Sequence, residues 1–288
     1  MHDDTLRCGR HRLALGARPL LMGIVNVTPD SFSDGGLAFE PEAAVRHALG
    51  LAAAGADLLD VGGESTRPGA DPVPEAEELR RVLPVLQALR PQVDVPISID
   101  TTKASVARAG LDAGCDLVND VSALRFDPGM LPLVVERDCG VVLMHMQGTP
   151  RTMQDAPRYD HVVAEVGAWL AARLEVATAA GIDSERVLLD PGIGFGKRFE
   201  DNLALLGGLE RLRVAGGRPL LVGASRKAFL GRLLDAPRPA ARLAGDLAVV
   251  AHCRAARVGV LRVHDVAAVR GFLRVLDALE SGAAPRDV

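Results

Sequence analysis

Aromatic residues and cysteines are scarce in this chain, and no hydrophobic run is long enough to cross a membrane. Phe, Trp and Tyr make up 3% of its residues, which argues against stacking platforms for single-stranded nucleic acid. The four cysteines, Cys8, Cys115, Cys139 and Cys253, lack C-x-x-C spacing, so neither a zinc knot nor a secreted disulfide framework is expected. The N-terminal segment lacks a signal-peptide cleavage pattern, and its apolar run falls short of the ~20 residues of a spanning helix. We therefore expect a cytoplasmic protein that does not bind membranes.

Neither sign of charge dominates. Lys and Arg number 33 against 37 for Asp and Glu, a net charge of −4 at pH 7, so no global basic field attracts nucleic acid. An anionic ligand would have to be held by local cations. Hydrophobic residues form 48% of the chain, which is ordinary for a globular protein. Its 288 residues suit one complete barrel, whose usual length is about 250.

Eight short apolar runs each end at or next to a polar residue. A strand buried on both faces is a continuous run of Val, Ile and Leu, and stretches with helical spacing separate most of these runs. The pattern predicts an α/β fold, a single-domain (β/α)8 TIM barrel over 1–288, with the barrel proper at about 20–280. The polar endings are Asn26, Glu64 with Arg67, Asp100, Asn119, His145, Asp190, Ser225 and Arg262. Polar loops alone would explain any single ending, but eight favour a shared site at the carboxyl ends of the strands.

Two familiar motifs are only partly matched. The GIGFGK segment (192–197) lacks the Walker spacing, and its glycines read G-x-G-x-G instead of G-x-G-x-x-G, so we expect a tight loop with positive φ and no dinucleotide site. Ser225 lies in GASRK and not in G-x-S-x-G, so a serine hydrolase is not expected. A proline, Pro84, lies in a helix predicted over Glu75 to Leu89 and should either kink that helix or mark its true start.

Oxygen donors gather in and beside the first long polar loop, whose composition suggests a mobile lid. Asn26, Asp30 and Asp34 suit a hard Mg²⁺ ion shared with substrate phosphates, although turn residues alone would give the same pattern. His145 and His264 lack a His or Cys companion at ligand spacing, so a zinc site is not expected.

Three polar strand endings suggest recognition of a flat ring. Asp100, Asn119 and Asp190 end different strands and offer acceptors and donors to a heterocycle with several N–H groups. Each could instead be paired structurally. Their position beside Lys227 and Arg262 favours ring recognition.

Eight ordered segments together resemble the dihydropteroate synthase family over about residues 20 to 280. They are MGIVNVTPDSFSDGG, DVGGESTRPGA, ISIDTTK, LVNDVSAL, LMHMQGTPRTMQ, LLDPGIGFGK, LLVGASRK and LRVHDV. The resemblance implies a homodimeric (β/α)8 barrel that uses Mg²⁺ in folate biosynthesis. The reaction that the resemblance implies joins 6-hydroxymethyl-7,8-dihydropterin pyrophosphate to p-aminobenzoate and gives 7,8-dihydropteroate and pyrophosphate. Small molecules are therefore the expected partners.

The resemblance also implies roles for residues of this chain. The pterin would be bound by Asp100, Asn119, Met144, Asp190, Lys227 and Arg262. Pyrophosphate would contact Asn26, Arg262 and His264, with Mg²⁺ on Asn26 and Asp34. p-Aminobenzoate would enter beside Thr66, Pro68, Phe195, Lys227 and Ser225 once the loops carrying Phe32 and Arg67 close. The catalytic residues would be Asp34, Arg67, Lys227 and Arg262, in a dissociative mechanism with a pterin cation.

Two alternatives share parts of this pattern: a pterin-binding methyltransferase barrel, and a non-catalytic paralogue that binds pterin or a partner protein. The methyltransferase would not need TPDSFSDGG, STRPG or SRK, and the paralogue should have lost lid or cation residues, none of which is lost here. The chain lacks the extra Phe-Gly that sulfonamide-resistant members carry near GFGKRF, so we expect sulfonamide sensitivity. His145 has no assigned role and is expected to be structural.

Overall fold

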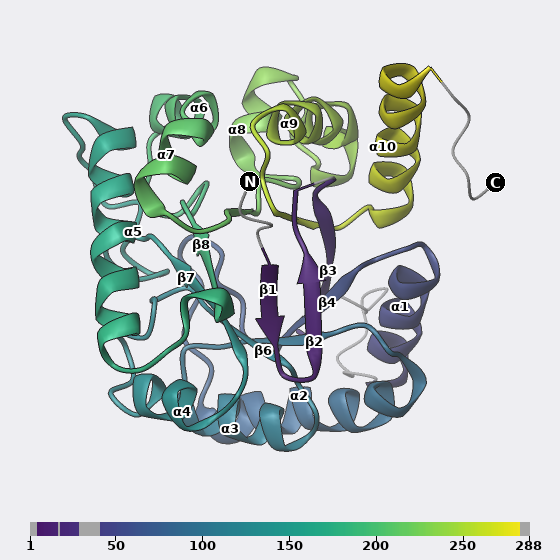
Figure 1. The fold of residues 1–288 in the computed structure, drawn as a ribbon, viewed down its shortest axis with the longest axis vertical. Helices are drawn as coiled ribbons and strands as arrows, with labels where there is room; N and C mark the ends of the chain where they lie inside the picture. Colours follow the sequence, from purple (N-terminus) through teal and green to yellow (C-terminus); the bar gives the residue numbers. More distant parts are fainter. Residues whose placement is uncertain (1–4, 17, 29–40, 283–288) are drawn as a thin grey trace.

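The computed structural model describes residues 5–16, 18–28 and 41–282. Eight parallel strands form one sheet in the order β8-β7-β6-β5-β4-β3-β10-β9. A parallel bridge between Leu189 and Leu220 joins the two ends of this sheet. The sheet is thus closed, and helices form a ring around it (Figure 1). This is the (β/α)8 barrel that the sequence predicts.

The strands are short and almost wholly buried, as expected where helices cover the outside of a parallel sheet. They are β3 (Leu20–Asn26), β4 (Leu58–Gly62), β5 (Ile97–Asp100), β6 (Leu117–Asp120), β7 (Gly140–Met144), β8 (Val187–Asp190), β9 (Leu221–Val222) and β10 (Val260–Val263). The helices are α1 (Pro41–Ala53), α2 (Glu75–Leu89), α3 (Ala104–Asp112), α4 (Met130–Glu136), α5 (Val162–Ala179), α6 (Phe199–Gly207), α7 (Leu209–Gly216), α8 (Ala228–Leu233), α9 (Leu243–Ala255) and α10 (Val266–Ser281). Short 3₁₀ helices lie at Arg90–Gln92, Ser184–Arg186 and Pro239–Arg242.

Helix α2 begins at Glu75 and continues through Pro84. Three glutamates occupy its first turn, where the partial positive charge of a helix start favours carboxylates. Of the two outcomes left open by the sequence, Pro84 as the true start of the helix is therefore wrong.

A β-hairpin that the sequence analysis did not predict precedes the barrel. Strands β1 (Thr5–Cys8) and β2 (His11–Ala14) pair antiparallel, and Gly9 allows the turn with a φ of 52°. Leu6 and Cys8 are fully buried and share one apolar cluster with side chains from the strand starts, among them Leu117 and Val260. The hairpin therefore covers the amino end of the barrel, and Figure 1 shows it in front of the strands.

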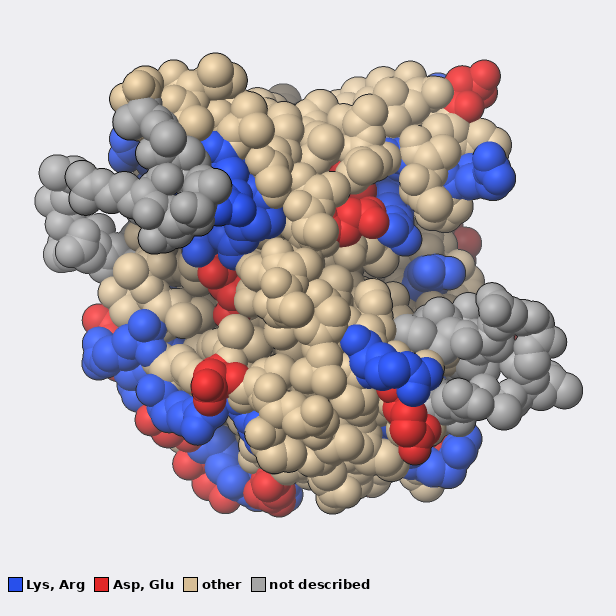
Figure 2. Space-filling view, turned by 90° about the vertical axis from the view of Figure 1, so that its right-hand side faces the viewer, with Lys and Arg blue, Asp and Glu red and all other residues tan. Residues whose placement is uncertain are grey.

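One face of the molecule shows no concentration of one charge (Figure 2). Figure 2 shows acidic and basic side chains interspersed on one face around a broad uncharged area. No helix in the described ranges is long and apolar enough to cross a bilayer.

Candidate active site

The alternation of side chains along each strand brings the polar strand endings into the barrel mouth. Residues two apart on a strand face the same side. Five side chains of the buried cluster under the hairpin are Leu58, Leu117, Val142, Leu188 and Val260. Two positions further along their strands stand, in the same order, Asp60, Asn119, Met144, Asp190 and Arg262. The interior is therefore apolar at its amino end and polar at its carboxyl end, where barrel enzymes place their active sites.

Asp60 is a site residue that the sequence analysis missed. Its carboxylate is fully buried and accepts hydrogen bonds from Arg262 Nε at 2.6 Å and Asn119 Nδ2 at 3.1 Å. Its other oxygen, Oδ1, has no partner in the described part of the chain. The alternation from Leu58 would have found Asp60, because both side chains face the interior.

Arg262 lies between two carboxylates. Its Nη2 donates to Asp100 Oδ2 at 2.8 Å, while its Nε is held by Asp60. Burial and the neighbouring Asp60 raise the pKa of Asp100, and Arg262 opposes that rise. Burial also disfavours the charge on Arg262, but Asp60 and Asp100 outweigh it and raise the pKa of the guanidinium. The expected pterin residues Asp100, Asn119 and Arg262 thus form one connected group with Asp60.

Asp190, which is buried, and Lys227, which is half-buried, are two further charged groups in the mouth. Burial raises the pKa of Asp190 to about 6, against the hydrogen bond from Gly192 N and the attraction of Lys227. Asp190 Oδ1 accepts that bond at 2.7 Å, so Oδ2 remains for a ligand. Burial and Arg262 lower the pKa of Lys227 to about 8. Strongly shifted ionisable groups gathered in one mouth are typical of a functional site.

The loop after β8 places Phe195 against Lys227, whose Nζ lies 4.1 Å from the ring centroid. Its glycines Gly192, Gly194 and Gly196 have φ of 66°, 83° and 60°, which confirms the expected positive-φ loop. A Cβ at Gly192 would lie 2.0 Å from the His145 carbonyl oxygen. Only glycine therefore allows this close approach.

Lys197 links the same loop to the residue that follows β7. Its Nζ contacts His145 Nδ1 at 3.0 Å and donates to the carbonyl oxygens of His145 at 3.2 Å and Phe195 at 2.8 Å. Burial, with the charge of Lys197, lowers the pKa of His145 to about 3, so the imidazole is neutral and its Nδ1 accepts. This supports the expectation that His145 is structural.

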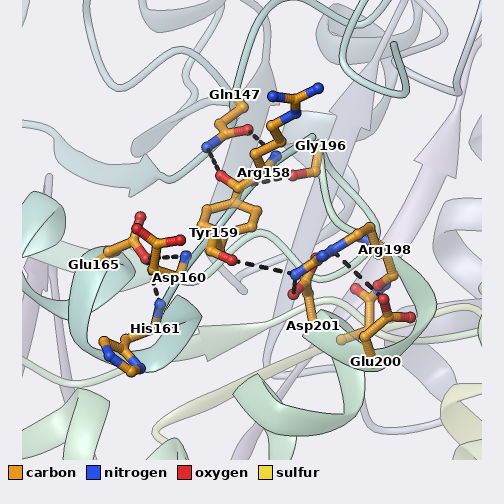
Figure 3. A network of polar contacts seen from close by, with 11 residues as sticks. Gln147, Arg158, Tyr159, Asp160, His161, Glu165, Gly196, Arg198, Glu200 and Asp201 are labelled. Carbon is orange, nitrogen blue, oxygen red and sulfur yellow. Dashed lines mark hydrogen bonds and ion pairs between the residues drawn. The ribbon is translucent and has the colours of Figure 1, made fainter. Parts of the chain in front are cut away.

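A second polar network ties this loop to the one after β7 (Figure 3). Tyr159 Oη donates to Gly196 O at 2.7 Å, and Arg198 Nη2 donates to Tyr159 O at 3.4 Å. Gln147 closes the β7 loop through two hydrogen bonds with the backbone of Arg158. The loop carrying Phe195 is therefore held from both sides.

The loop after β4 carries Thr66, Arg67 and Pro68 and borders a cavity of about 280 Å³ that Thr66 shares with Asp100 and Phe126. Arg67 and Pro68 are exposed. Phe195, Ser225 and Pro68 do not line this cavity. Of the five residues expected around p-aminobenzoate, Thr66 alone lines this cavity.

An ion cluster that the sequence analysis missed stands at the base of this loop. Lys103 pairs with Glu64 of the loop and with Glu78 of α2. Glu64 also accepts a hydrogen bond from Val73 N at 3.2 Å. The cluster therefore fixes both ends of the segment that presents Thr66 to Pro68.

Ser225 and His264 meet on the other side of the mouth. His264 Nδ1 lies 3.0 Å from Ser225 Oγ, which itself lies 3.0 Å from Asp246 Oδ2. Burial, with Arg226 and Arg262 nearby, lowers the pKa of His264 to about 3. Asp246 was not among the residues singled out in the sequence.

Asn26 is the described half of the expected Mg²⁺ site. It ends β3 half-buried, and its side-chain amide has no hydrogen-bond partner within residues 5–16, 18–28 and 41–282. Asp34, like Asp30 and Phe32, lies outside the described residues. In those ranges no group of three His, Cys, Asp or Glu side chains could hold a metal. Because Mg²⁺ is commonly held by one or two protein oxygens with water and substrate phosphates, Asn26 fits a site shared with substrate.

The fold and this mouth define a class. A family model described as "Pterin binding enzyme" matches residues 22–264, which is most of the chain. The protein is therefore a pterin-binding barrel enzyme.

Relatives narrow this class further. The dihydropteroate synthase of Synechocystis sp. is 45% identical over 92% of this chain and 91% of its own. The Xanthomonas albilineans dihydropteroate synthase solved with 4-aminobenzoic acid is 50% identical, with a TM-score of 0.90 over 97% of this chain and 99% of its own. Its complex with 7,8-dihydropteroate is 48% identical, with a TM-score of 0.87 over 96% and 99%. The chain belongs to the dihydropteroate synthase family, whose members are transferases.

Proposed function

We propose that this chain condenses 6-hydroxymethyl-7,8-dihydropterin pyrophosphate with p-aminobenzoate and releases 7,8-dihydropteroate and pyrophosphate. The observation that carries the proposal is the ring of inward-facing Asp100, Asn119 and Asp190 beside the cations Lys227 and Arg262. Carboxylate and amide groups gathered in one mouth suit the N–H donors of a pterin. Met144 shares an apolar cluster with Val121, Met146 and Met153, against which Phe195 packs, and would support the ring.

The proposed mechanism is dissociative. The C–O bond to pyrophosphate breaks first, the aromatic amine then attacks the pterin cation, and its proton leaves. Arg262 and His264 would bind the departing anion through charge-assisted hydrogen bonds. Asp34 would stabilise the cation, as the family resemblance implies. Mg²⁺ held by Asn26, and by Asp34 as proposed, would neutralise charge on the pyrophosphate.

No protein nucleophile is needed in this scheme. The hydroxyl of Ser225 is engaged by Asp246 and His264 and is not poised to attack. Lys227 carries its charge close to the Phe195 ring and would attract the carboxylate of p-aminobenzoate entering beside Thr66, Pro68 and Ser225. Closure of the loop carrying Arg67 would exclude water, which otherwise captures the cation.

We further propose a cytoplasmic homodimer that sulfonamides inhibit. These properties rest on the family and on the GFGKRF segment, which lacks the additional Phe-Gly.

Pyrophosphate release tests the proposal. We expect release only when both substrates and Mg²⁺ are present, measured in the complete mixture and with each component omitted in turn. No release in the complete mixture would contradict the proposal. Pterin binding without turnover would then favour the non-catalytic paralogue, and methyl transfer to a corrinoid partner would favour the methyltransferase.

A further inference from the structure

The hydroxyl of Ser225 makes three hydrogen-bonding contacts, as many as a hydroxyl can. It lies 3.0 Å from Asp246 Oδ2, 3.3 Å from the backbone N of His264 and 3.0 Å from His264 Nδ1. Asp246 is 4% exposed, and its Oδ1 accepts from Arg226 N at 2.8 Å. A hydroxyl has one donor and two acceptor positions, so these contacts determine where each proton lies.

The proton positions follow from the partners. An ionised Asp246 can only accept, so Ser225 donates to it. The backbone N–H of His264 can only donate and occupies one lone pair of Ser225. The remaining lone pair must accept from His264 Nδ1, which therefore carries the imidazole proton. In the neutral ring, Nε2 is then a bare acceptor, and it has no hydrogen-bond partner in the described part of the chain.

A bare acceptor cannot donate to an anion. If Ser225 keeps all three hydrogen bonds, Nε2 gains a proton in one of two ways: His264 becomes an imidazolium, or Asp246 is protonated and the chain of hydrogen bonds reverses toward Nδ1. Both states hold one proton more than the ionised chain. In either case, placing a proton on Nε2 therefore requires the uptake of one proton from solvent.

We propose that the Asp246–Ser225–His264 chain couples the binding of pyrophosphate at His264 to the uptake of one proton. Asp246 acts as a positioning residue, because it touches neither substrate and works through Ser225. The inference rests on the proposed function, since it takes His264 as a pyrophosphate ligand.

The surroundings of the chain are mixed in charge. The charged groups that act on His264 are Arg226 and Lys227 of the β9–α8 loop, Arg262 of β10, and Asp265, which immediately precedes α10. Burial lowers the pKa of His264 to about 3 and raises that of Asp246. Free His264 is thus neutral at pH 7, and the extra proton must arrive with the anion.

The Asp246→Asn variant separates the two states. The Asn carbonyl oxygen would keep the bond from Arg226 N, which turns the amide N–H₂ toward Ser225. Ser225 must then donate to His264 Nδ1, and the proton of the neutral ring moves to Nε2. This variant should bind pyrophosphate without the extra proton.

Calorimetric titration with inorganic pyrophosphate in excess MgCl₂, in buffers of different ionisation enthalpy at pH 7.5, counts the protons taken up. We expect the wild-type chain to take up about one proton more than Asp246→Asn or His264→Gln, because only the wild type needs an extra proton to present an N–H to the anion. One linked proton should also change the affinity about tenfold per pH unit. The matched control is Asp265→Asn, which removes a nearby negative charge paired with Arg226 and leaves both partners of Ser225 in place. It should retain the wild-type proton count.

Equal proton uptake by the wild type and Asp246→Asn overturns the inference. If Asp246→Asn does not fold, equal uptake by the wild type and His264→Gln overturns it. A wild type that releases pyrophosphate in the complete reaction but shows no such difference contradicts this inference alone. A wild type that shows the difference but never releases pyrophosphate contradicts the proposed function instead.

Discussion

Asp190→Asn should weaken pterin binding without unfolding the barrel. Asp190 Oδ1 accepts a hydrogen bond from Gly192 N at 2.7 Å. An asparagine would keep its carbonyl oxygen in that bond, because only the carbonyl can accept from an N–H. Its N–H₂ would then replace Oδ2, the oxygen left for the pterin, and would face an N–H of the ligand.

The size of the effect follows from this geometry. The pterin loses one hydrogen bond to a charged acceptor, worth about 1.5–3 kcal/mol, which corresponds to about a 10- to 150-fold loss of affinity. The raised pKa of Asp190, about 6, gives the pH dependence. The ionised carboxylate is present above pH 6 and is lost as the pH falls through it, so the wild type should approach the variant between pH 7 and pH 5.

Calorimetric titration with 6-hydroxymethyl-7,8-dihydropterin measures this affinity. Asp116→Asn is the matched control, since Asp116 is also a buried carboxylate but binds Ile97 N and Arg90 at the start of β6. It should lower stability and leave pterin affinity unchanged. An unchanged affinity in Asp190→Asn would remove Asp190 from the pterin site.

Three further predictions concern the loop, the hairpin and inhibition. Gly192→Ala should lower the free energy of unfolding by about 4 kcal/mol or prevent folding, because its Cβ would lie 2.0 Å from His145 O. The control is Gly217→Ala, at a similar φ of 68° with nothing within 4 Å of the added Cβ, which should cost only about 1 kcal/mol. Similar losses for the two variants in urea denaturation would refute the packing argument. Leu6→Ala, in the fully buried hairpin core, should lower the free energy of unfolding by about 2–5 kcal/mol. The control is Leu279→Ala, at a residue 75% exposed, which should change it by less than about 0.5 kcal/mol. Equal urea midpoints of unfolding for the two variants would show that the hairpin does not stabilise the barrel. A sulfonamide should raise the apparent KM for p-aminobenzoate without changing the maximal rate, and turnover unaffected at high sulfonamide would contradict the expected sensitivity.

Fold prediction succeeded where a local pattern repeats. Each strand is a short apolar run because both of its faces are covered, and each run ends where its chain enters the mouth. The hairpin over Thr5 to Ala14 escaped because neither of its strands is a continuous apolar run. Half of the residues in β2 are exposed, so no apolar run marks it.

The strand endings indicated a shared mouth, in which Asp100, Asn119 and Arg262 do lie together, but they gave no sign of the residues that act through them. Asp60 lies two residues before the end of β4, inside the apolar run and not at its end, so the pattern of strand endings does not mark it. Asp246 lies in the first turn of α9, where an acidic residue is ordinary for a helix start. Neither position signals its partner, since Arg262 and Ser225 are distant in sequence.

The sequence by itself determined the barrel, its eight polar strand endings and the family, because periodicity and ordered motifs are properties of neighbouring residues. Only the tertiary structure decided which of these groups meet. Asp60, Asn119 and Arg262 become hydrogen-bonded because the closed sheet brings β4, β6 and β10 around one interior. A charge in that buried interior needs a partner, and the hydrogen bonds of Arg262 and Ser225 orient the groups on which the proposed chemistry depends.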